Sequence, residues 1–520
     1  MEKGLKMKKR IAAIDVGSSE IRMSIWEVEE NTGKFTVLEE LRVHVTLGKD
    51  IFDKARIDND SIDEAILILK RYKRLCDEYK TDSITAVTST TLNDAENINL
   101  FLDRVRYEVE IDLRVLTVSR EINYIYQAIK NNENYKNDDS SKYKGIVEVG
   151  SGSVDFIIFS KKAIVFSRSF PIGALKVKQI FDNATNLEEN FLNYLKVTID
   201  HELISIKREI PKSKINVVFG IGAELEILQD LVKSKNPEDG YMNRSNMQKF
   251  ISQIQDYTEE ELVHKLQIPY DYTETFQAKC FIFSKIIDFF DFDDVYIPKI
   301  SLRDGIIYEQ MMTNHQESLY LQNRLQMRIN AINIGRRLNY DEKHAMTVTR
   351  FAMKIFDETK QLHHLGDREK LFLMCASILH DVGMSLSPSS HHKHSMYIIK
   401  TQSFFFFNDE ERDIVANIAR YHRRSIPKST HPDYAVLSRE SKVKVMKLAA
   451  ILRLADSLDS THLQLVKDVN VTFTNNEISP IVITAVTDGE LFTERITFKS
   501  KRDLFEFIYG IKPKLRVKRK

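Results

Sequence analysis

Apolar residues recur along this chain with two different spacings. Short apolar runs at 35–47 and 83–88 have the character of strands, and a stretch at 61–79 has the period of a helix. The polar segment 131–143, NNENYKNDDSSKY, separates this region from a new strand that starts at Gly145. The alternation of strands and helices predicts an α/β lobe on each side of the polar segment.

One of these strands is interrupted by residues that suit a ligand. In IAAIDVGSSEIRMSI (11–25), an apolar run leads into Asp15, Gly17 and Ser18, and an alternating second strand follows. A plain hairpin turn is one interpretation, since glycine lets the backbone bend. The other is a phosphate cradle, because small residues expose N–H groups and hydroxyls to an anion while the carboxylate is free to bind a metal. A single copy of the motif favours the plain turn.

The motif occurs a second time in GIVEVGSGSVDFIIF (145–159), where Glu148 lies 133 positions after Asp15. At the same offset, the glycine and the serine of the first copy fall on Gly150 and Ser151. A repeat that matches in residue type, in strand context and in place within each lobe indicates a duplicated α/β lobe. Two facing turns would grip a phosphate group from both sides, so the functional interpretation now outweighs the plain turn.

The end of the second lobe carries two further signals. INVVFGIGAELEIL (215–228) runs from a strand through Gly220 and Gly222 into a helix, a turn of the kind that packs closely or approaches a ligand. ISLRDGIIYEQ (300–310) closes the lobe. Taken alone, each is a weak signal.

From about Glu317 to about Leu463 the pattern is that of long helices rich in His, Arg and Met. Beyond it, DVNVTFT, PIVITAV and ERITFKS resemble strands, RDLFEFIYG resembles a short helix, and the basic tail KPKLRVKRK is typical of a solvated, disordered end. The predicted fold is therefore α/β plus all-α. The predicted domains are a first lobe at 1–130, a second lobe at 143–312, a helical domain at 318–463 and a small α/β unit at 464–520.

Composition sets bounds on this picture. The 520 residues suffice for about three or four domains, and 76 Lys and Arg nearly cancel 75 Asp and Glu, so overall charge predicts neither nucleic acid nor a membrane surface as a partner. The three cysteines, Cys76, Cys280 and Cys375, lack a metal-binding spacing and predict a reduced cytoplasmic protein without disulfides. No apolar run has the length of a signal-peptide core or a membrane span.

The helical region holds an ordered set of metal-ligand types. His344, the adjacent His380 and Asp381, and Asp456 each stand on an otherwise apolar helix. They can supply imidazole nitrogens and carboxylate oxygens to a divalent metal, and burying them without partners is costly. A satisfied core residue is the alternative for any single histidine. The set, in LHDVG and LRLADSLD, resembles the HD superfamily of metal-dependent phosphohydrolases, and this resemblance implies that the four residues bind the metal.

Two further stretches are rich in histidine and arginine. HHKHS contains His391, His392 and His394, and RYHRRS contains Arg420, His422, Arg423 and Arg424. Additional metal ligands are one interpretation, and a basic lining for an anionic chain is a plainer one. A merely solvated surface is as good an interpretation as either role, since runs of charge usually face solvent.

The duplicated turn, FGIG, LRDG and the helical region together resemble the exopolyphosphatase and guanosine pentaphosphate phosphohydrolase (Ppx/GppA) family over nearly the whole chain. The resemblance implies two lobes of the actin-like ATPase and sugar kinase fold, Mg²⁺ or Mn²⁺ at the phosphate cleft, and a homodimer. Members of the family cleave terminal phosphate from polyphosphate or from pppGpp. Their helical domain extends the site into a basic channel for a long polyanion.

By the same resemblance, Glu121 in VSREINYIY is the general base that polarises the attacking water, and Glu148 helps to hold that water or the metal. The chain departs from the family at Ser19 and Glu20, where the acid would place negative charge near phosphate, and at Asn93, where the family has an arginine. The phosphate-binding residues that the resemblance implies are Asp15, Gly17, Ser18, Asn93, Gly150, Ser151, Gly152, Ser153, Gly220 and Gly222.

The expected function is that of an exopolyphosphatase-like hydrolase, which releases terminal orthophosphate from inorganic polyphosphate by metal-assisted attack of water between the two lobes. Three alternatives stay open: a pppGpp 5′-phosphohydrolase, a phosphohydrolase that works at the HD-like site, and a polyphosphate or alarmone sensor without activity. The expected partners are polyphosphate or pppGpp.

Overall fold

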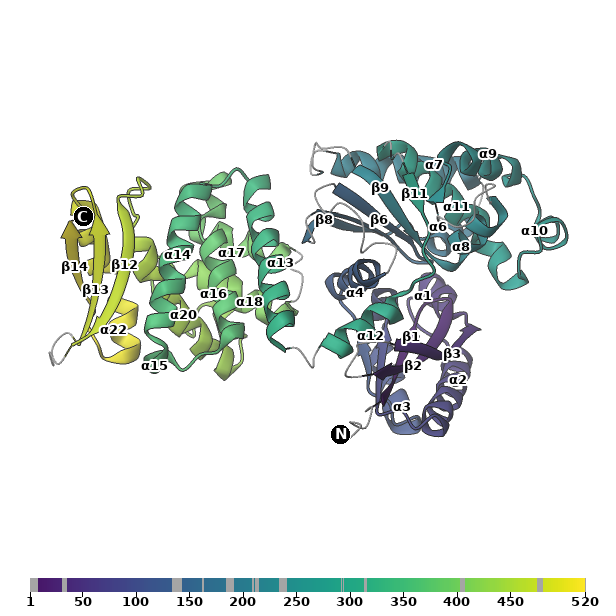
Figure 1. The fold of residues 1–520 in the computed structure, drawn as a ribbon, viewed down its shortest axis with the longest axis horizontal. Helices are drawn as coiled ribbons and strands as arrows, with labels where there is room; N and C mark the ends of the chain where they lie inside the picture. The colour runs from purple at the N-terminus through teal and green to yellow at the C-terminus, as the bar shows by residue number, and fades with distance from the viewer. Residues whose placement is uncertain are drawn as a thin grey trace, which may run out of the picture. The chain divides into compact units, whose positions relative to one another are not determined.

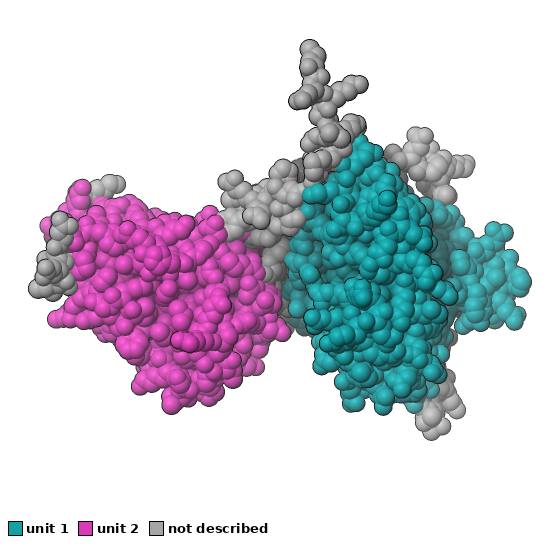
Figure 2. Space-filling model, turned by 90° about the horizontal axis from the view of Figure 1, so that it is seen from below, with its two compact units in different colours: residues 1–320 teal, residues 321–520 magenta. Residues whose placement is uncertain are grey.

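The chain forms two compact units in the computed structural model, residues 1–320 and 321–520 (Figure 1, Figure 2). The structure describes residues 8–29, 35–132, 143–160, 163–183, 191–207, 210, 215–232, 241–290, 292, 294–312, 316–402, 407–474 and 480–519. Among these residues, no helix combines the length and the apolar content that crossing a membrane requires.

The first lobe is a five-stranded sheet in the order β3-β2-β1-β4-β5. Antiparallel pairing joins β1 to β2 and β2 to β3, and β4 and β5 add in parallel. Helices α2 and α3 cover one face and share its apolar core, and α4 and α12 lie on the other face (Figure 1). The elements are β1 (Lys8–Val16), β2 (Glu20–Glu29), β3 (Phe35–His44), α1 (Leu47–Lys54), α2 (Asn59–Glu78), β4 (Ser83–Thr88), the 3₁₀ helix η1 (Thr90–Asp94), α3 (Ile98–Glu108), β5 (Leu113–Val115) and α4 (Val118–Asn131).

The second lobe repeats this arrangement within a six-stranded sheet of order β10-β11-β9-β6-β7-β8. Its strands β8-β7-β6-β9-β11 have the order and the directions of β3-β2-β1-β4-β5, which confirms two α/β lobes. The elements are β6 (Tyr143–Val149), β7 (Val154–Ser160), β8 (Ala163–Phe170), α6 (Ala174–Asn183), α7 (Phe191–Ile206), β9 (Ile215–Ile221), α8 (Ala223–Val232), β10 (Tyr241–Met242), α9 (Arg244–Ile254), α10 (Glu259–Leu266), α11 (Tyr270–Phe290), β11 (Asp294–Tyr296) and α12 (Leu302–Met312).

Helix α12 returns from the second sheet to the first lobe and packs on α4. Gly305 of α12 lies so close to α4 that a Cβ added there would sit 1.9 Å from Tyr124 O. The Arg120 guanidinium of α4 forms an ion pair of 2.8 Å with Glu309 of α12. These contacts fix α4, the helix that carries Glu121, against the chain that leaves the second lobe.

The second unit begins with helices and ends with a small sheet (Figure 1). Helices α14, α16, α18 and α20 contact one another in a closed ring, α14 to α16, α16 to α18, α18 to α20 and α20 to α14. The helical elements are α13 (Gln316–Arg337), α14 (Glu342–Glu358), α15 (Lys360–His363), α16 (Asp367–Leu379), the 3₁₀ helix η4 (Val382–Ser385), α17 (His391–Thr401), α18 (Asp409–Arg420), α19 (Pro432–Ala435) and α20 (Arg439–Ser457). The rest are β12 (Val466–Phe473), β13 (Ile481–Thr487), α21 (Phe492–Lys501), α22 (Asp503–Tyr509) and β14 (Lys514–Arg519).

Two predictions for the C-terminal region are wrong. ERITFKS is part of helix α21, in which Glu494 and Phe498 are buried on one face and Ile496 is exposed, so burial at helical spacing overrides its strand-like composition. The basic tail is not disordered, because β14 pairs in parallel with β13. Leu515 and Val517 are half-buried in this strand, and the intervening Lys and Arg side chains are exposed, a pattern suited to an edge strand.

We predict that Gly305→Ala lowers the free energy of unfolding of the first lobe by about 1 to 3 kcal/mol, because the new methyl group forces α12 away from α4. This loss exceeds the gain in helix propensity that alanine brings. Trp26 is the single tryptophan of the chain and lies buried in β2, so its fluorescence during urea unfolding follows this lobe. Gly145→Ala, in β6 of the second lobe, is the control, since its Cβ would meet no atom closer than 3.4 Å and the first-lobe transition reported by Trp26 should stay unchanged. Equal stability of the two variants would contradict the packing described for α12.

Candidate functional site

The two acid-glycine-serine turns have the same conformation. Gly17 N donates to Glu20 O at 2.8 Å and Gly150 N donates to Ser153 O at 2.9 Å, so each turn closes a tight antiparallel hairpin. A Cβ at Gly150 would lie 2.9 Å from Ser153 O, a contact that only glycine avoids. The motif is thus a hairpin turn in both lobes.

The two turns meet at a cavity of about 150 Å³ in the first unit, which we call the interlobe cavity. Ser19 Oγ of the first turn and Ser151 Oγ of the second lie 2.9 Å apart, so the turns touch directly. Most of the residues predicted to bind phosphate or to catalyse line this cavity: Asp15, Gly17, Ser18, Glu121, Glu148, Gly150, Ser151, Gly152, Ser153 and Gly222.

Asn93 and Gly220 lie outside the lining of the cavity. Asn93 is exposed in η1, and Thr90 and Thr91 of the same segment line the cavity instead. Gly220 lies within β9, where a Cβ would sit 2.6 Å from the Phe283 ring, so this glycine is needed for packing. The structure does not bring either residue to the place where phosphate was predicted.

The two hairpins carry different charges at equivalent positions. Asp15 pairs across its hairpin with Arg22, and the Arg22 guanidinium forms an ion pair with the Asp15 carboxylate. Glu148 pairs in the same register with Asp155, a second acid. Burial and the neighbouring Asp155 raise the pKa of Glu148 to about 8, and burial raises the pKa of Asp155 to about 6. The duplication has produced an ion pair in the first lobe and an acid pair in the second.

Glu121 joins the acid pair from the first turn of α4. It is 8% exposed, and its carboxylate accepts hydrogen bonds from Thr90 N at 3.1 Å and from Thr90 Oγ1 at 3.0 Å. Burial, followed by the charges of Asp155 and Glu148, raises its pKa well above the usual range. Carboxyl groups from α4, β6 and β7 therefore share one buried space, and their mutual repulsion falls when they bind protons or a divalent cation.

Glu20 is held by residues from both lobes. Tyr272 of α11 donates to Glu20 Oε1 at 2.8 Å, and the guanidinium groups of Arg22 and Arg42 lie 3.9 Å from its carboxylate. Although burial opposes ionisation, the two arginines and the tyrosine lower the pKa of Glu20. The negative charge expected near phosphate at this position is therefore largely balanced.

Acidic side chains outnumber basic ones around the interlobe cavity. Arg22 and Lys279 are each paired with a carboxylate, Lys279 with Glu224 Oε1 at 2.6 Å. The acidic residues of the lining are Asp15, Glu20, Glu121, Glu148, Asp155, Glu224, Asp271 and Glu274, and the basic ones are Arg22, Lys49 and Lys279. A phosphate chain is repelled by such a lining unless cations neutralise it.

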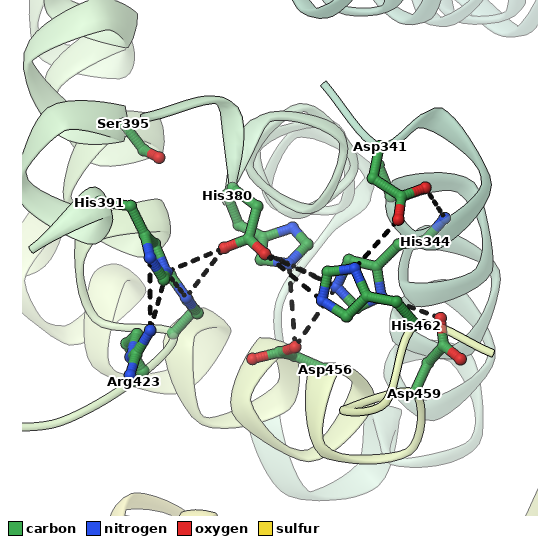
Figure 3. A network of polar contacts seen from close by, with 12 residues as sticks. Asp341, His344, His380, His391, Ser395, Arg423, Asp456, Asp459 and His462 are labelled. Atoms are coloured by element: carbon green, nitrogen blue, oxygen red, sulfur yellow. Dashed lines mark hydrogen bonds and ion pairs between the residues drawn. The ribbon is translucent and has the colours of Figure 1, made fainter. Parts of the chain in front are cut away.

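A second set of side chains converges in the helical region of the second unit (Figure 3). His344 Nε2 of α14 lies 3.2 Å from His380 Nε2 at the end of α16. Asp381 Oδ2 lies 3.8 and 3.7 Å from these two nitrogens, and Asp456 Oδ1 of α20 lies 3.6 and 3.8 Å from them. The residues predicted as metal ligands, His344, His380, Asp381 and Asp456, are thus brought together around one point.

Hydrogen bonds orient both histidines of this set. Nδ1 of His380 donates to Ser377 O at 2.8 Å, and Nδ1 of His344 lies 2.8 Å from Asp459 Oδ2, so each ring directs Nε2 to the shared point. Although burial opposes a charge, Asp456 and Asp459 raise the pKa of His344 to about 10. The carboxylates therefore stabilise positive charge here, which a proton or a metal ion supplies.

Comparison with known proteins identifies the family. The model described as the Ppx/GppA phosphatase family matches residues 26–314, more than half of the chain. The chain belongs to the Ppx/GppA phosphatase family. A second model, Ppx/GppA phosphatase domain III, matches residues 328–485.

Two relatives are named guanosine-5′-triphosphate,3′-diphosphate pyrophosphatase. The protein of Pseudoalteromonas atlantica is 21% identical over 458 residues, covering 85% of this chain and 86% of its own length. The protein of Vibrio vulnificus is 20% identical over 451 residues with the same coverage of both chains. Among solved structures, an exopolyphosphatase from Cytophaga hutchinsonii has a TM-score of 0.51 at 20% identity and covers 58% of this chain and 98% of its own, a likeness of fold.

Within this Ppx/GppA protein, the sequence interpretation missed residues that lie across a strand or a turn from those it named. Arg22 and Asp155 each follow the acid of their turn by seven positions, so the 133-residue offset between the two copies could have found them. Asp459 and His462 were also missed, and the His462 ring stacks on His344 with ring centroids 3.6 Å apart. The HD-like identity of domain III stays a prediction.

Of the histidines in the two basic stretches, the structure brings His391 and His422 to the Asp381 carboxylate. A merely solvated surface is therefore the wrong interpretation for these two residues. His392 is buried and His394 is half-buried on α17, and the metal-ligand groups found among the described residues include neither.

We predict that Arg22→Met destabilises the first lobe by about 3 kcal/mol, because it leaves the buried Asp15 carboxylate without its counter-charge. Adding Asp15→Asn should restore part of this stability, since the buried charge is then removed as well. Urea unfolding followed by Trp26 fluorescence measures both variants. A double variant no more stable than the single one would show that the pair does not hold this hairpin.

Proposed function

We propose that this Ppx/GppA protein hydrolyses a terminal phosphoanhydride bond in the interlobe cavity and releases orthophosphate from inorganic polyphosphate. The observation that carries this proposal is the acid cluster of Glu121, Glu148 and Asp155, which lines the same cavity as the two serine-containing turns. Such a cluster repels a polyphosphate unless divalent cations occupy the cluster. Cations bound there would attract the polyphosphate. The names of the relatives, pyrophosphatase and exopolyphosphatase, support a phosphoanhydride as substrate.

Glu148 and Asp155 are the residues proposed to hold Mg²⁺ or Mn²⁺, because hard cations prefer carboxylate oxygens. Asp155 is buried and Glu148 half-buried, and neither has a lysine or arginine paired to it across the hairpin. When bound, such an ion neutralises charge on the phosphoryl oxygens. Ser18 and Ser151 of the two turns line the same cavity, and their hydroxyls are the proposed donors to the same oxygens.

Glu121 is the proposed general base. Its burial beside two other acids makes its carboxylate a better proton acceptor than an exposed one, and Thr90 fixes its orientation. In the proposed reaction, the water oxygen bonds to the terminal phosphorus and the bridging P–O bond breaks. The proton of the water passes to Glu121, and the shortened chain leaves as an anion.

The choice of substrate, the oligomeric state and a metal site in domain III are proposals or predictions of the same kind. Hydrolysis of pppGpp at this cavity is the first alternative, and the homodimer implied by the family resemblance stays a prediction.

We also propose that His344, His380, Asp381 and Asp456 hold a divalent ion in domain III, which would support a phosphohydrolase there. The specific observation in favour is that the two Nε2 atoms lie 3.2 Å apart and that one oxygen of each aspartate lies 3.6 to 3.8 Å from both nitrogens.

We predict that Glu121→Gln lowers kcat for orthophosphate release by about 10²- to 10⁴-fold, because the glutamine cannot accept the proton of the water. The assay measures phosphate released from polyphosphate and from pppGpp with Mg²⁺ or Mn²⁺. His380→Ala is the matched control, since it alters domain III and should leave this turnover intact.

Three other results would each decide against this account. Wild-type protein that releases no phosphate from either substrate would overturn the proposal, and thermal stabilisation by either ligand in that protein would favour a sensor. Loss of turnover in His380→Ala, with Glu121→Gln unaffected, would assign the hydrolysis to domain III.

A further inference from the structure

We propose that a second cavity in the first unit, which we call the β2 cavity, binds inorganic phosphate. The cavity has a volume of about 230 Å³, and it is lined by strands β2 and β3 and by the starts of helices α8 and α12. The phosphate has two possible sources, the proposed reaction in the neighbouring interlobe cavity and the solution. Where the source is the reaction, the inference rests on the proposed function.

The β2 cavity and the interlobe cavity share a wall. Arg22, Glu148, Gly222, Ala223 and Leu302 line both of them. Gly222 has a φ of +142°, a conformation that residues with a Cβ rarely adopt, so no side chain projects from the wall at this position. An orthophosphate ion released in the interlobe cavity is therefore formed next to the β2 cavity.

Strand β2 carries polar atoms without partners at this cavity. Arg22, Ser24 and Trp26 alternate along β2, so they lie on one face of the strand, and all three line the cavity. Their Nε, Oγ and Nε1 atoms are buried and have no hydrogen-bond partner among the described residues. Ser24 and Trp26 are only 4% and 5% exposed. Because buried donors normally have a partner, this row of side chains indicates a ligand that offers acceptors.

Two helices begin at the wall of the same cavity. Gly222 and Ala223 lie at the start of α8, which has 10 residues, and both line the cavity. Ser301 and Leu302 lie at the start of α12, which has 11 residues, and they line it too. The N–H groups of a first helical turn lack acceptors within the helix, and the positive end of the helix dipole favours an anion. Donors thus come from three elements, and a negatively charged acceptor suits all of them.

The charge of the β2 cavity also suits an anion better than that of the interlobe cavity. Its lining has four basic and four acidic side chains, whereas the interlobe cavity has three and eight. Glu40 is already balanced, because Arg303 donates to its Oε1 at 2.5 Å. The eight charged residues of the β2 cavity are Arg22, Arg42, Lys299, Arg303, Glu40, Glu148, Glu226 and Asp304.

Two further residues reduce the repulsion of a phosphate. Lys299 is exposed, and the ion pairs among the described residues do not include it. Burial raises the pKa of Glu226 to about 7, although Arg42 and Lys299 act in the opposite direction. Near neutral pH, Glu226 is therefore partly protonated, and in that form its hydroxyl donates to an anion. Inorganic phosphate meets these conditions, since it is small, negatively charged and rich in acceptor oxygens.

The experiment uses Trp26 as the reporter. It is the single tryptophan of the chain, and it lines the β2 cavity but does not belong to the lining of the interlobe cavity. The full chain is titrated with sodium phosphate in the presence of a chelator, so that the acid cluster of the interlobe cavity holds no divalent cation and repels the anion. We expect a saturable change in Trp26 fluorescence that sodium chloride of equal ionic strength does not produce.

Variants of two lining residues test where the phosphate binds. Lys299→Ala should raise Kd about tenfold, because a charge-assisted contact is lost. Ser24→Ala should raise it about three- to tenfold and leave urea unfolding nearly unchanged, since its hydroxyl has no partner among the described residues. Lys249→Ala is the matched control, because Lys249 is exposed on α9 of the second lobe, and it should leave Kd unchanged.

Rapid mixing with polyphosphate and Mg²⁺ distinguishes the two sources. In the wild type, phosphate formed by turnover should produce the Trp26 signal, whereas in Glu121→Gln only added phosphate should do so. A signal with added phosphate in a protein that hydrolyses nothing would support the site, assign its ligand to the solution and overturn the proposed function.

Hydrolysis of polyphosphate without a saturable response of Trp26 to phosphate would overturn the site and leave the proposed function intact. Equal Kd values in the wild type, Lys299→Ala and Ser24→Ala would also overturn it. A response to guanosine and not to phosphate would show that the cavity binds a different class of ligand.

Discussion

Across each hairpin of this protein, the acid before the turn pairs with the residue seven positions later, and the two pairs differ in charge. In the first lobe the partner of Asp15 is Arg22, which forms an ion pair with it. In the second lobe the partner of Glu148 is Asp155, so a half-buried acid faces a buried one. The same backbone geometry therefore supplies a stable, neutral hairpin on one side and an unbalanced acidic one on the other. Burial makes this imbalance costly, and a divalent cation is the partner that we propose for it.

The two units differ in the kind of ligand they offer. Around the interlobe cavity the candidate ligands are carboxylate oxygens, which suit Mg²⁺ or Mn²⁺. In domain III the candidates are mainly imidazole nitrogens with fixed orientation, which suit softer transition metals. The candidate ligands of each set all lie within one unit. A family phosphatase with two independent metal sites would respond differently to different metals.

Much of the cleft could be predicted because its signals are local. The repeated acid-glycine-serine turn is contiguous in sequence, and its strand context predicted the two lobes that the topology confirms. Arg22 and Asp155 were missed because they become neighbours of the turn acids only through strand register. The strand predicted at ERITFKS failed because burial of Glu494 and Phe498 at helical spacing decides the conformation there. The approach of His391 and His422 to the Asp381 carboxylate could not be read from the sequence, since it depends on the packing of α17 against η4 and α18.

The central claim is that the acid pair of the second hairpin, and not the ion pair of the first, holds the catalytic cation. Anomalous scattering from crystals grown with Mn²⁺ tests this claim most directly, because it locates the ion without reference to activity. The account predicts a peak within bonding distance of Glu148 and Asp155, on the side of the interlobe cavity that Glu121 faces, and loss of this peak in Asp155→Asn. A cavity without an anomalous peak, at Mn²⁺ concentrations that support phosphate release, would contradict it.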